Sequence, residues 1–167
     1  MDLMEELIQE RITRAKELPG IVRHAAIATV NEDGSPHNTP VFATFDDQFN
    51  AYWSSSPDAL HSQNIARTGQ VFIVLFDSTG QGGGLFMRCT ASLLEGDAIV
   101  RGLAAINAKR AAIGRPAIEQ SMFQADSPQR LYEAVPAQLW VNYAERDSAG
   151  RVLRDIRHEI TVAELVR

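Results

Sequence analysis

The segment 52–64, YWSSSPDALHSQN, contains the side chains best suited to binding an anion. A run of three serines, 54–56, precedes Pro57, and a proline in this setting is typical of the first turn of a helix. Unpaired N–H groups and the helix dipole favour a phosphate there, and the three hydroxyls add donors. His61 and Asn64 follow at helical spacing and share one helix face. The segment therefore predicts a phosphate cradle at the start of a helix.

A simpler interpretation of the same segment needs no ligand. Ser56 would cap the helix with its hydroxyl, and the helix would end at about Arg67, before Thr68-Gly69. His61 and Asn64 would then be solvated surface residues. The residues alone favour this second interpretation.

Other chemical motifs are missing from the sequence. The glycine-rich loop 80–84 lacks the spacing of a phosphate-binding P-loop, and we expect a flexible hairpin loop there. No HExxH, GxSxG or GxGxxG pattern occurs, and the four histidines are scattered. Cys89 alternates with apolar residues in a predicted strand, which indicates an inert core thiol. We therefore predict no metal site and assign no catalytic residue.

Arg88 and Trp140 are the remaining candidates for a binding site. Arg88 lies on the polar face of its predicted strand, where it can meet an anion or form an ordinary surface ion pair. In the predicted strand 137–146, Trp140 shares a face with Gln138 and Asn142. A large aromatic ring between two amides suits a ligand pocket or a subunit interface, and simple half-burial is the alternative.

These residues must be positioned by antiparallel strands with helices at their ends. The apolar strand 71–77 needs cover on both faces, and Pro36 and Pro40 mark an edge or irregular strand. The pattern predicts an α+β fold, an antiparallel split or nearly closed β-barrel of about six to seven strands with peripheral helices. We expect strands at 24–30, 35–45, 49–55, 71–77, 85–96, 137–146 and 151–156, and helices at 2–18, 57–67, 97–113, 127–132 and from Thr161.

Length and charge limit the class of protein. A chain of 167 residues forms one domain, which we divide into an N-terminal helix, 1–19, and a barrel, 20–167. A net charge of −5 argues against nucleic-acid binding. The sequence has neither a secretory signal nor an apolar run of membrane length, and it has a single cysteine. We expect a cytoplasmic protein without a membrane partner.

The order of these segments resembles the pyridoxamine 5′-phosphate oxidase-like, FMN-binding split-barrel family. The resemblance is carried by HAAIATVNEDGSPHNTPVFATF, YWSSSPDALHSQNIARTGQVFIVLFD and LFMRCTASLLEGD, with LWVNYAERDSAGRVLRDIRHEI as the closing strands. It covers residues 20–97 well and the rest loosely. It implies a homodimer of split barrels with FMN at the subunit interface. The chain departs from the family at His61, where lysine is usual, and at Cys89, where glycine is common.

The resemblance also implies which residues hold the cofactor. The strand around Asn38 runs beside the flavin ring, and the serine run with its following helix holds the ribityl chain and phosphate. The full predicted cofactor-binding set is Asn38, Thr39, Pro40, Val41, Trp53, Ser54, Ser55, Ser56, His61, Asn64, Arg88 and Trp140.

The implied function is that of a flavin-dependent oxidoreductase. Such a protein passes a hydride between a small-molecule substrate, or reduced nicotinamide, and an acceptor through flavin N5. The alternatives are a deazaflavin-dependent reductase, or a non-catalytic or cofactor-free dimeric binding or stress-response module. The colour of the purified protein separates the flavin-binding hypothesis from the cofactor-free one.

Overall fold

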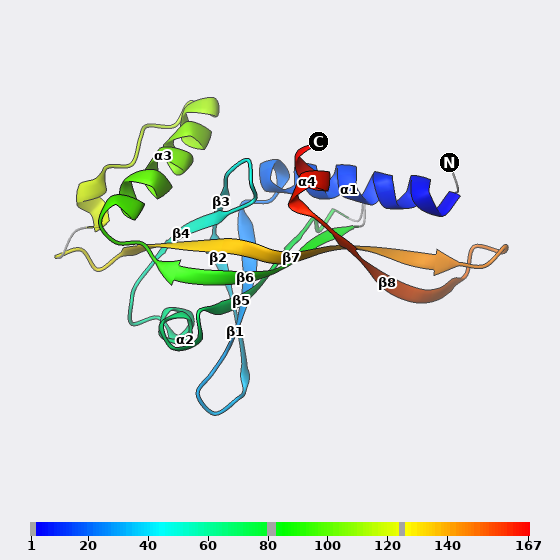
Figure 1. Ribbon diagram of the computed structural model, residues 1–167, viewed down its shortest axis with the longest axis horizontal. Coiled ribbons are helices and arrows are strands. Elements are labelled where there is room, and N and C mark those ends of the chain that lie inside the picture. Colours follow the sequence, from blue (N-terminus) through cyan, green and yellow to red (C-terminus); the bar gives the residue numbers. More distant parts are fainter. Residues whose placement is uncertain (1–2, 80–82, 124–125) are drawn as a thin grey trace.

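The computed structural model describes residues 3–79, 83–123 and 126–167. The described residues form an antiparallel sheet with helices on both sides (Figure 1). The strands are β1 (His24–Val30), β2 (Pro36–Phe42), β3 (Thr44–Phe45), β4 (Ala51–Ser55), β5 (Gln70–Phe76), β6 (Gly84–Leu93), β7 (Arg130–Arg146) and β8 (Val152–Ile160). The helices are α1 (Leu3–Ile21), α2 (Leu60–Thr68), α3 (Asp97–Ala112), the 3₁₀ turn η1 (Gln120–Phe123) and α4 (Val162–Val166).

The connection between β2 and β3 closes the sheet into a split barrel. The strand order is β2-β1-β5-β6-β7-β4-β3, with β8 added on β7. The two edge strands, β2 and β3, are separated in the chain by Ala43 alone, so the opposite edges of the sheet meet in one segment. The α+β split-barrel prediction is confirmed, with eight strands among the described residues in place of six or seven. The prediction that Pro36 and Pro40 mark an edge strand is also confirmed.

Alternating residues of the strands fill the barrel. One side of each strand points inward and is buried, and one side of α1 packs against β6 and β7. Figure 1 shows α1, α3 and α4 on one side of the long strands and α2 on the other, with the β7–β8 hairpin reaching beyond the barrel. The inward core residues include Ile12, Ala15, Leu18, Ala25, Ile27, Val71, Ile73, Leu75, Leu85, Met87, Leu139 and Val141.

Helix α1 is longer than its sequence predicts. Pro19 was expected to end it, yet the helix continues to Ile21. A proline removes one donor of the helical ladder, and here the ladder resumes with a 2.8 Å hydrogen bond from Val22 N to Leu18 O. Leu18 is fully buried, and its packing holds this last turn in place.

Strand β7 replaces a predicted helix. Residues 127–132 were expected to start a helix, but β7 begins at Arg130 and runs for 17 residues. Its first half pairs with β4 and its second half with β8. Between the halves the pairing with β6 shifts register, with Pro136 opposite Cys89 and Gln138 opposite Arg88. The extra residue bends β7 so that one strand serves two neighbours.

The C-terminal strand and helix follow their predictions, and the strand is longer than expected. β8 runs from Val152 to Ile160, past the predicted end at residue 156, and Thr161 and Glu164 form the predicted capping box of α4. Residues 80–82 of the predicted loop 80–84 lie outside the described residues. No helix in the described ranges has the length and apolar character needed to cross a membrane.

Candidate functional site

The serine run does not act as one unit, because its three side chains take different directions. Ser55 Oγ lies 2.7 Å from His61 Nε2, so β4 and α2 meet through this pair. Ser54 is exposed and lines a large cavity on another side of β4. Ser56 Oγ accepts a 3.2 Å hydrogen bond from Asp58 N. Neighbouring residues of a strand point to opposite faces, which separates Ser54 from Ser55.

Helix α2 begins later than predicted, and Ser56 is not its cap. The cap position belongs to Ala59, which makes no side-chain cap hydrogen bond. Residues 56–59 form a turn instead, closed by a 3.1 Å hydrogen bond from Ala59 N to Ser56 O. The first helical hydrogen bond is from Gln63 N to Ala59 O. The backbone N–H groups before Gln63 in the first turn therefore have no acceptor from a capping side chain. The C-terminal end is as predicted, at Gly69 in the left-handed region.

His61 is buried in the first turn of α2. Only 7% of its surface is exposed, so the interpretation of His61 as a solvated residue is wrong. Burial lowers the pKa of its imidazole, and the nearby His37 lowers it further. The free protein therefore holds His61 neutral at pH 7, hydrogen-bonded to Ser55.

Asn64 is buried as well, but it has a structural role. Its Nδ2 donates to Thr29 Oγ1 at 3.0 Å and to Asn31 Oδ1 at 2.8 Å. These bonds tie α2 to the end of β1 and use both amide hydrogens. Asn64 therefore does not flank the serine run as the helical spacing predicts.

A second group of predicted residues lies on the outer face of the sheet. The strand register places them in two adjacent rows that cross five strands. Arg88 is three strands from Asn38, which corresponds to about 14 Å. The first row is Asn38, Ala28, Phe72, Arg88 and Gln138, and the second is Pro40, Ala26, Val74, Phe86 and Trp140.

The outer face combines aromatic rings with cations. Trp140 stacks on Phe72 with ring centroids 6.1 Å apart. The guanidinium of Arg157 from β8 lies 4.2 Å from the centre of the Phe86 ring. Among the described residues no carboxylate lies within 4.0 Å of Arg88, so the surface ion pair considered for it is not formed there. Sequence reasoning missed Arg157, although the two-sided apolar pattern of β5 indicated this face.

Some predicted cofactor residues direct their side chains into the barrel. Val41 and Trp53 are buried, and Trp53 stacks on Tyr132 at 5.7 Å. Thr39 pairs with Ile27 on the inward side of β2, which leaves Asn38 and Pro40 to face outward. Cys89 is buried, and burial raises the pKa of its thiol to about 12, in agreement with an inert core thiol.

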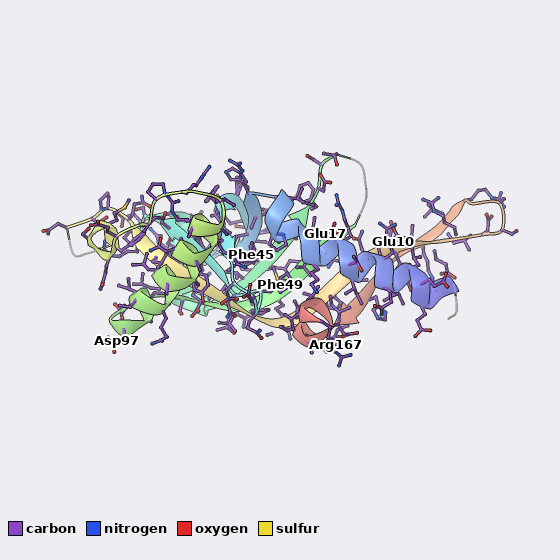
Figure 2. All side chains as sticks on the ribbon, turned by 90° about the horizontal axis from the view of Figure 1, so that it is seen from above. Glu10, Glu17, Phe45, Phe49, Asp97 and Arg167 are labelled. Carbon is purple, nitrogen blue, oxygen red and sulfur yellow. The ribbon has the colours of Figure 1, made fainter. Side chains whose placement is uncertain are left out.

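A cavity of about 1060 Å³ lies next to β3 and β4, and the sequence did not predict it. The C-terminal end of α1, the β3–β4 hairpin and the C-terminal end of α3 form its walls. Figure 2 shows Phe45 and Phe49 between α3 and α1. Ser54 is the one member of the serine run that lines it. The residues of its walls are far apart in the sequence, and no local pattern connects them.

Comparison with known proteins adds fold information. No protein-family model and no curated protein sequence matches the chain. Among solved structures, a protein related to general stress protein 26, of the pyridoxinephosphate oxidase family, from Clostridium acetobutylicum matches with a TM-score of 0.61 and 16% identity. The match covers 94% of this chain and 98% of that one.

Two further structures show the same architecture. A putative pyridoxamine 5′-phosphate oxidase from Listeria innocua matches with a TM-score of 0.57 and 15% identity, over 80% of this chain and 96% of that one. The heme storage protein HutZ from Vibrio cholerae matches with a TM-score of 0.59 and 21% identity, over 84% and 95%. The chain therefore has the split-barrel fold that pyridoxamine 5′-phosphate oxidase-like proteins share with heme-handling relatives.

Proposed function

We propose that the chain is an FMN-binding flavoprotein that works as a homodimer and transfers hydride between small molecules. The observation that carries the proposal is the start of α2, where a turn of N–H groups without a side-chain cap lies beside the Ser55–His61 pair. Its fold is shared with structures named as pyridoxamine 5′-phosphate oxidases, which supports a flavin as the ligand.

The residues at the start of α2 fit a phosphate group. The first-turn N–H groups point along the helix axis and favour negative charge. The Ser55 hydroxyl can donate to a phosphate oxygen while His61 holds its direction. A phosphate near His61 would favour the imidazolium form, so binding would raise the imidazole pKa from its lowered value. No acidic side chain occupies the first turn of α2 to oppose this charge.

The outer face of the sheet fits a second copy of the chain. Antiparallel sheet faces that meet water are normally polar, yet this one carries Phe42 at 48% and Phe76 at 54% exposure. Phe72, Phe86 and Trp140 continue the apolar surface between them. A two-fold interface on this face would cover these rings and place Asn38 and Pro40 at the subunit boundary.

The residues of this chain would bind and orient the cofactor. FMN, when bound, supplies a ring system that accepts and donates hydride at N5. Ser55 and the start of α2 would hold the phosphate, and Asn38 with Pro40 would present β2 to the ring. Arg88 and Trp140 would line the adjoining outer face, where an anionic or aromatic substrate can be oriented.

Absorption spectroscopy of the purified protein tests the proposal. We expect flavin bands as isolated, or after reconstitution with FMN and removal of excess ligand. The heme-handling relatives suggest hemin as a parallel titrant, which would give a Soret band instead. A deazaflavin spectrum would support the reductase alternative. A colourless protein that retains none of these ligands would overturn the proposal in favour of the cofactor-free module.

A further inference from the structure

We propose that the cavity between α1 and α3 is a binding site for an amphipathic organic anion, a molecule with an apolar body and one carboxylate or phosphate group. The cavity is separate from the Ser55–His61 pair, since neither residue lines it. The proposal therefore does not depend on FMN binding. Its volume of about 1060 Å³ is enough for a ligand the size of a cofactor or a long acyl chain.

The inner wall of the cavity is apolar and well packed. Phe45, Phe49, Trp53 and Leu131 all line it and are each 6% exposed or less. Among the described residues, Phe49 is also the one non-glycine residue whose backbone is left-handed, at φ 61°. The turn around it is held by Asp46, whose carboxylate accepts from Gln48 N at 2.8 Å and from Asn50 N at 3.0 Å. This turn fixes an unfavourable backbone conformation that puts an aromatic ring in the wall.

The rim of the cavity is cationic, although the chain as a whole is acidic. Lys16 and Arg23 approach from the end of α1, and Arg110 and Arg115 from the end of α3. Within the described ranges, no carboxylate lies within 4.0 Å of any of these four side chains. The fifth cation of the lining, Lys109, pairs with Asp47 at 2.6 Å.

The negative charges near the rim are already engaged. Asp46, the other carboxylate of the lining, also accepts from Asn50 Nδ2 at 2.9 Å and from Tyr52 Oη at 3.1 Å. Five cations against the two carboxylates Asp46 and Asp47 give the lining a local excess of positive charge in a chain of net charge −5. An anion is the ligand that this arrangement attracts.

The wall formed by the α3 end is held in place without a ligand. Asn107 Oδ1 accepts from Ile118 N at 2.8 Å, and Asn107 Nδ2 donates to Ile118 O at 3.0 Å. Arg110 Nε donates to Pro116 O at 2.7 Å, which leaves its terminal nitrogens available. These bonds fix the backbone of the loop that follows α3, so the Arg110 side chain is preorganised at the rim and the backbone of Arg115 is held beside it.

Fluorescence titration with anilinonaphthalene sulfonate, an aromatic ring system with one anionic group, tests the proposal. We expect saturable binding at one laurate-displaceable site per chain. Laurate should displace the dye, whereas 1-dodecanol, with the same apolar length and no charge, should displace it at least tenfold less well. The double variant Arg110→Gln/Arg115→Gln should weaken dye and laurate binding about tenfold or more.

Two matched variants make the result specific. Arg101→Gln removes an exposed cation of α3 that does not line the cavity, so it should leave both affinities unchanged. Ala112→Trp places a large ring at an exposed position of the rim and should block binding without disturbing the core. All variants keep the outer sheet face, so dye bound there contributes equally to each.

The outcomes separate this proposal from the proposed function. Loss of dye and laurate binding in the double variant, with FMN affinity retained, supports the cavity site. Equal laurate affinity in wild type, the double variant and Ala112→Trp would overturn it. Equal displacement by laurate and dodecanol would show an apolar cavity without anion selectivity, and would overturn it as well. Failure of FMN binding alone would leave the cavity proposal standing.

Discussion

The inner and outer faces of β5 use similar residues in different surroundings. Val71, Ile73 and Leu75 point into the barrel and are 3%, 0% and 0% exposed. Phe72 and Val74 point outward and are half-buried, and Phe76 is 54% exposed. Side chains of this chain cover the inner face of β5 completely. The outer face carries comparable apolar area that the chain itself does not cover, which is typical of an interaction surface.

The polar groups follow the same division. Asn142 Oδ1 on the outer side of β7 is buried and has no partner in the described chain, and Arg88 has no carboxylate nearby. On the inner side of β1, the buried Thr29 Oγ1 accepts a 3.0 Å hydrogen bond from Asn64 Nδ2. A face with unsatisfied groups and exposed rings indicates that its partner is another molecule.

The largest effect should come from the inner face. Ile73→Ala should lower the free energy of unfolding by about 4 kcal/mol, because it leaves a cavity in a fully packed core. Val74→Ala, at the next position on the outer face, should cost less than half of that for the monomer. Urea denaturation of dilute protein measures both. Equal losses would contradict the distinction between the two faces.

A charge introduced on the outer face should weaken association between two copies of the chain. Phe76→Arg should weaken dimerisation about a hundredfold, since the two-fold repeats the change in both copies. Light scattering should give twice 18.4 kDa for wild type and 18.4 kDa for the variant at micromolar concentration. A wild-type mass of 18.4 kDa would refute the homodimer, and an unchanged dimer in Phe76→Arg would place its interface elsewhere.

Most of the fold could be predicted from local patterns. Apolar or alternating runs located β1, β4, β5 and β6 because each has one or two buried faces. The strand β7 was missed at its start because Ser127-Pro128 is typical of a helix start, whereas pairing of Leu131 and Tyr132 with β4 determines the structure. The end of α1 was missed because burial of Leu18 outweighs the breaking tendency of Pro19.

The candidate site was predictable only in part. The closeness of Ser55 and His61 follows from a strand that leads into a helix, and the separation of Ser54 from Ser55 follows from strand alternation. The role of Asn64 depends on Thr29 at the end of β1, which is 35 residues away along the chain. The cationic cavity depends on the meeting of two helix ends, and neither helix end indicates this in its own sequence.

Loss of a helix cap should have a moderate effect on the free energy of unfolding, and only at Thr161, which caps a helix. Thr161→Ala should lower the free energy of unfolding by about 1 kcal/mol, because Thr161 caps the helix that places Leu165 in the inner core. Ser56→Ala should cost less than about 0.5 kcal/mol, because Ser56 caps no helix. Thermal or urea unfolding compares them. A larger loss for Ser56→Ala would restore it as the cap of α2.

The smallest expected effect is a pH dependence from His61. Its pKa is lowered in the folded protein by burial and His37, so the unfolded chain binds a proton more readily. The contribution of neutral His61 to stability should be complete above the reference pKa of about 6.5, and should fall as the pH drops below it. The free energy of unfolding, measured from pH 7.5 to 5 in wild type and His61→Gln, isolates the contribution of His61. Identical pH profiles would show that His61 does not titrate differently on folding.

FMN titration of wild type, Ser55→Ala and Ser56→Ala by flavin fluorescence quenching tests the central claim most directly. The two serines are adjacent, but Ser55 alone contacts His61 at the start of α2. We predict that Ser55→Ala weakens FMN about tenfold without a matching loss of stability, and that Ser56→Ala binds as wild type. Wild-type protein that does not bind FMN, or equal FMN affinity in Ser55→Ala and wild type, would contradict the phosphate site at α2.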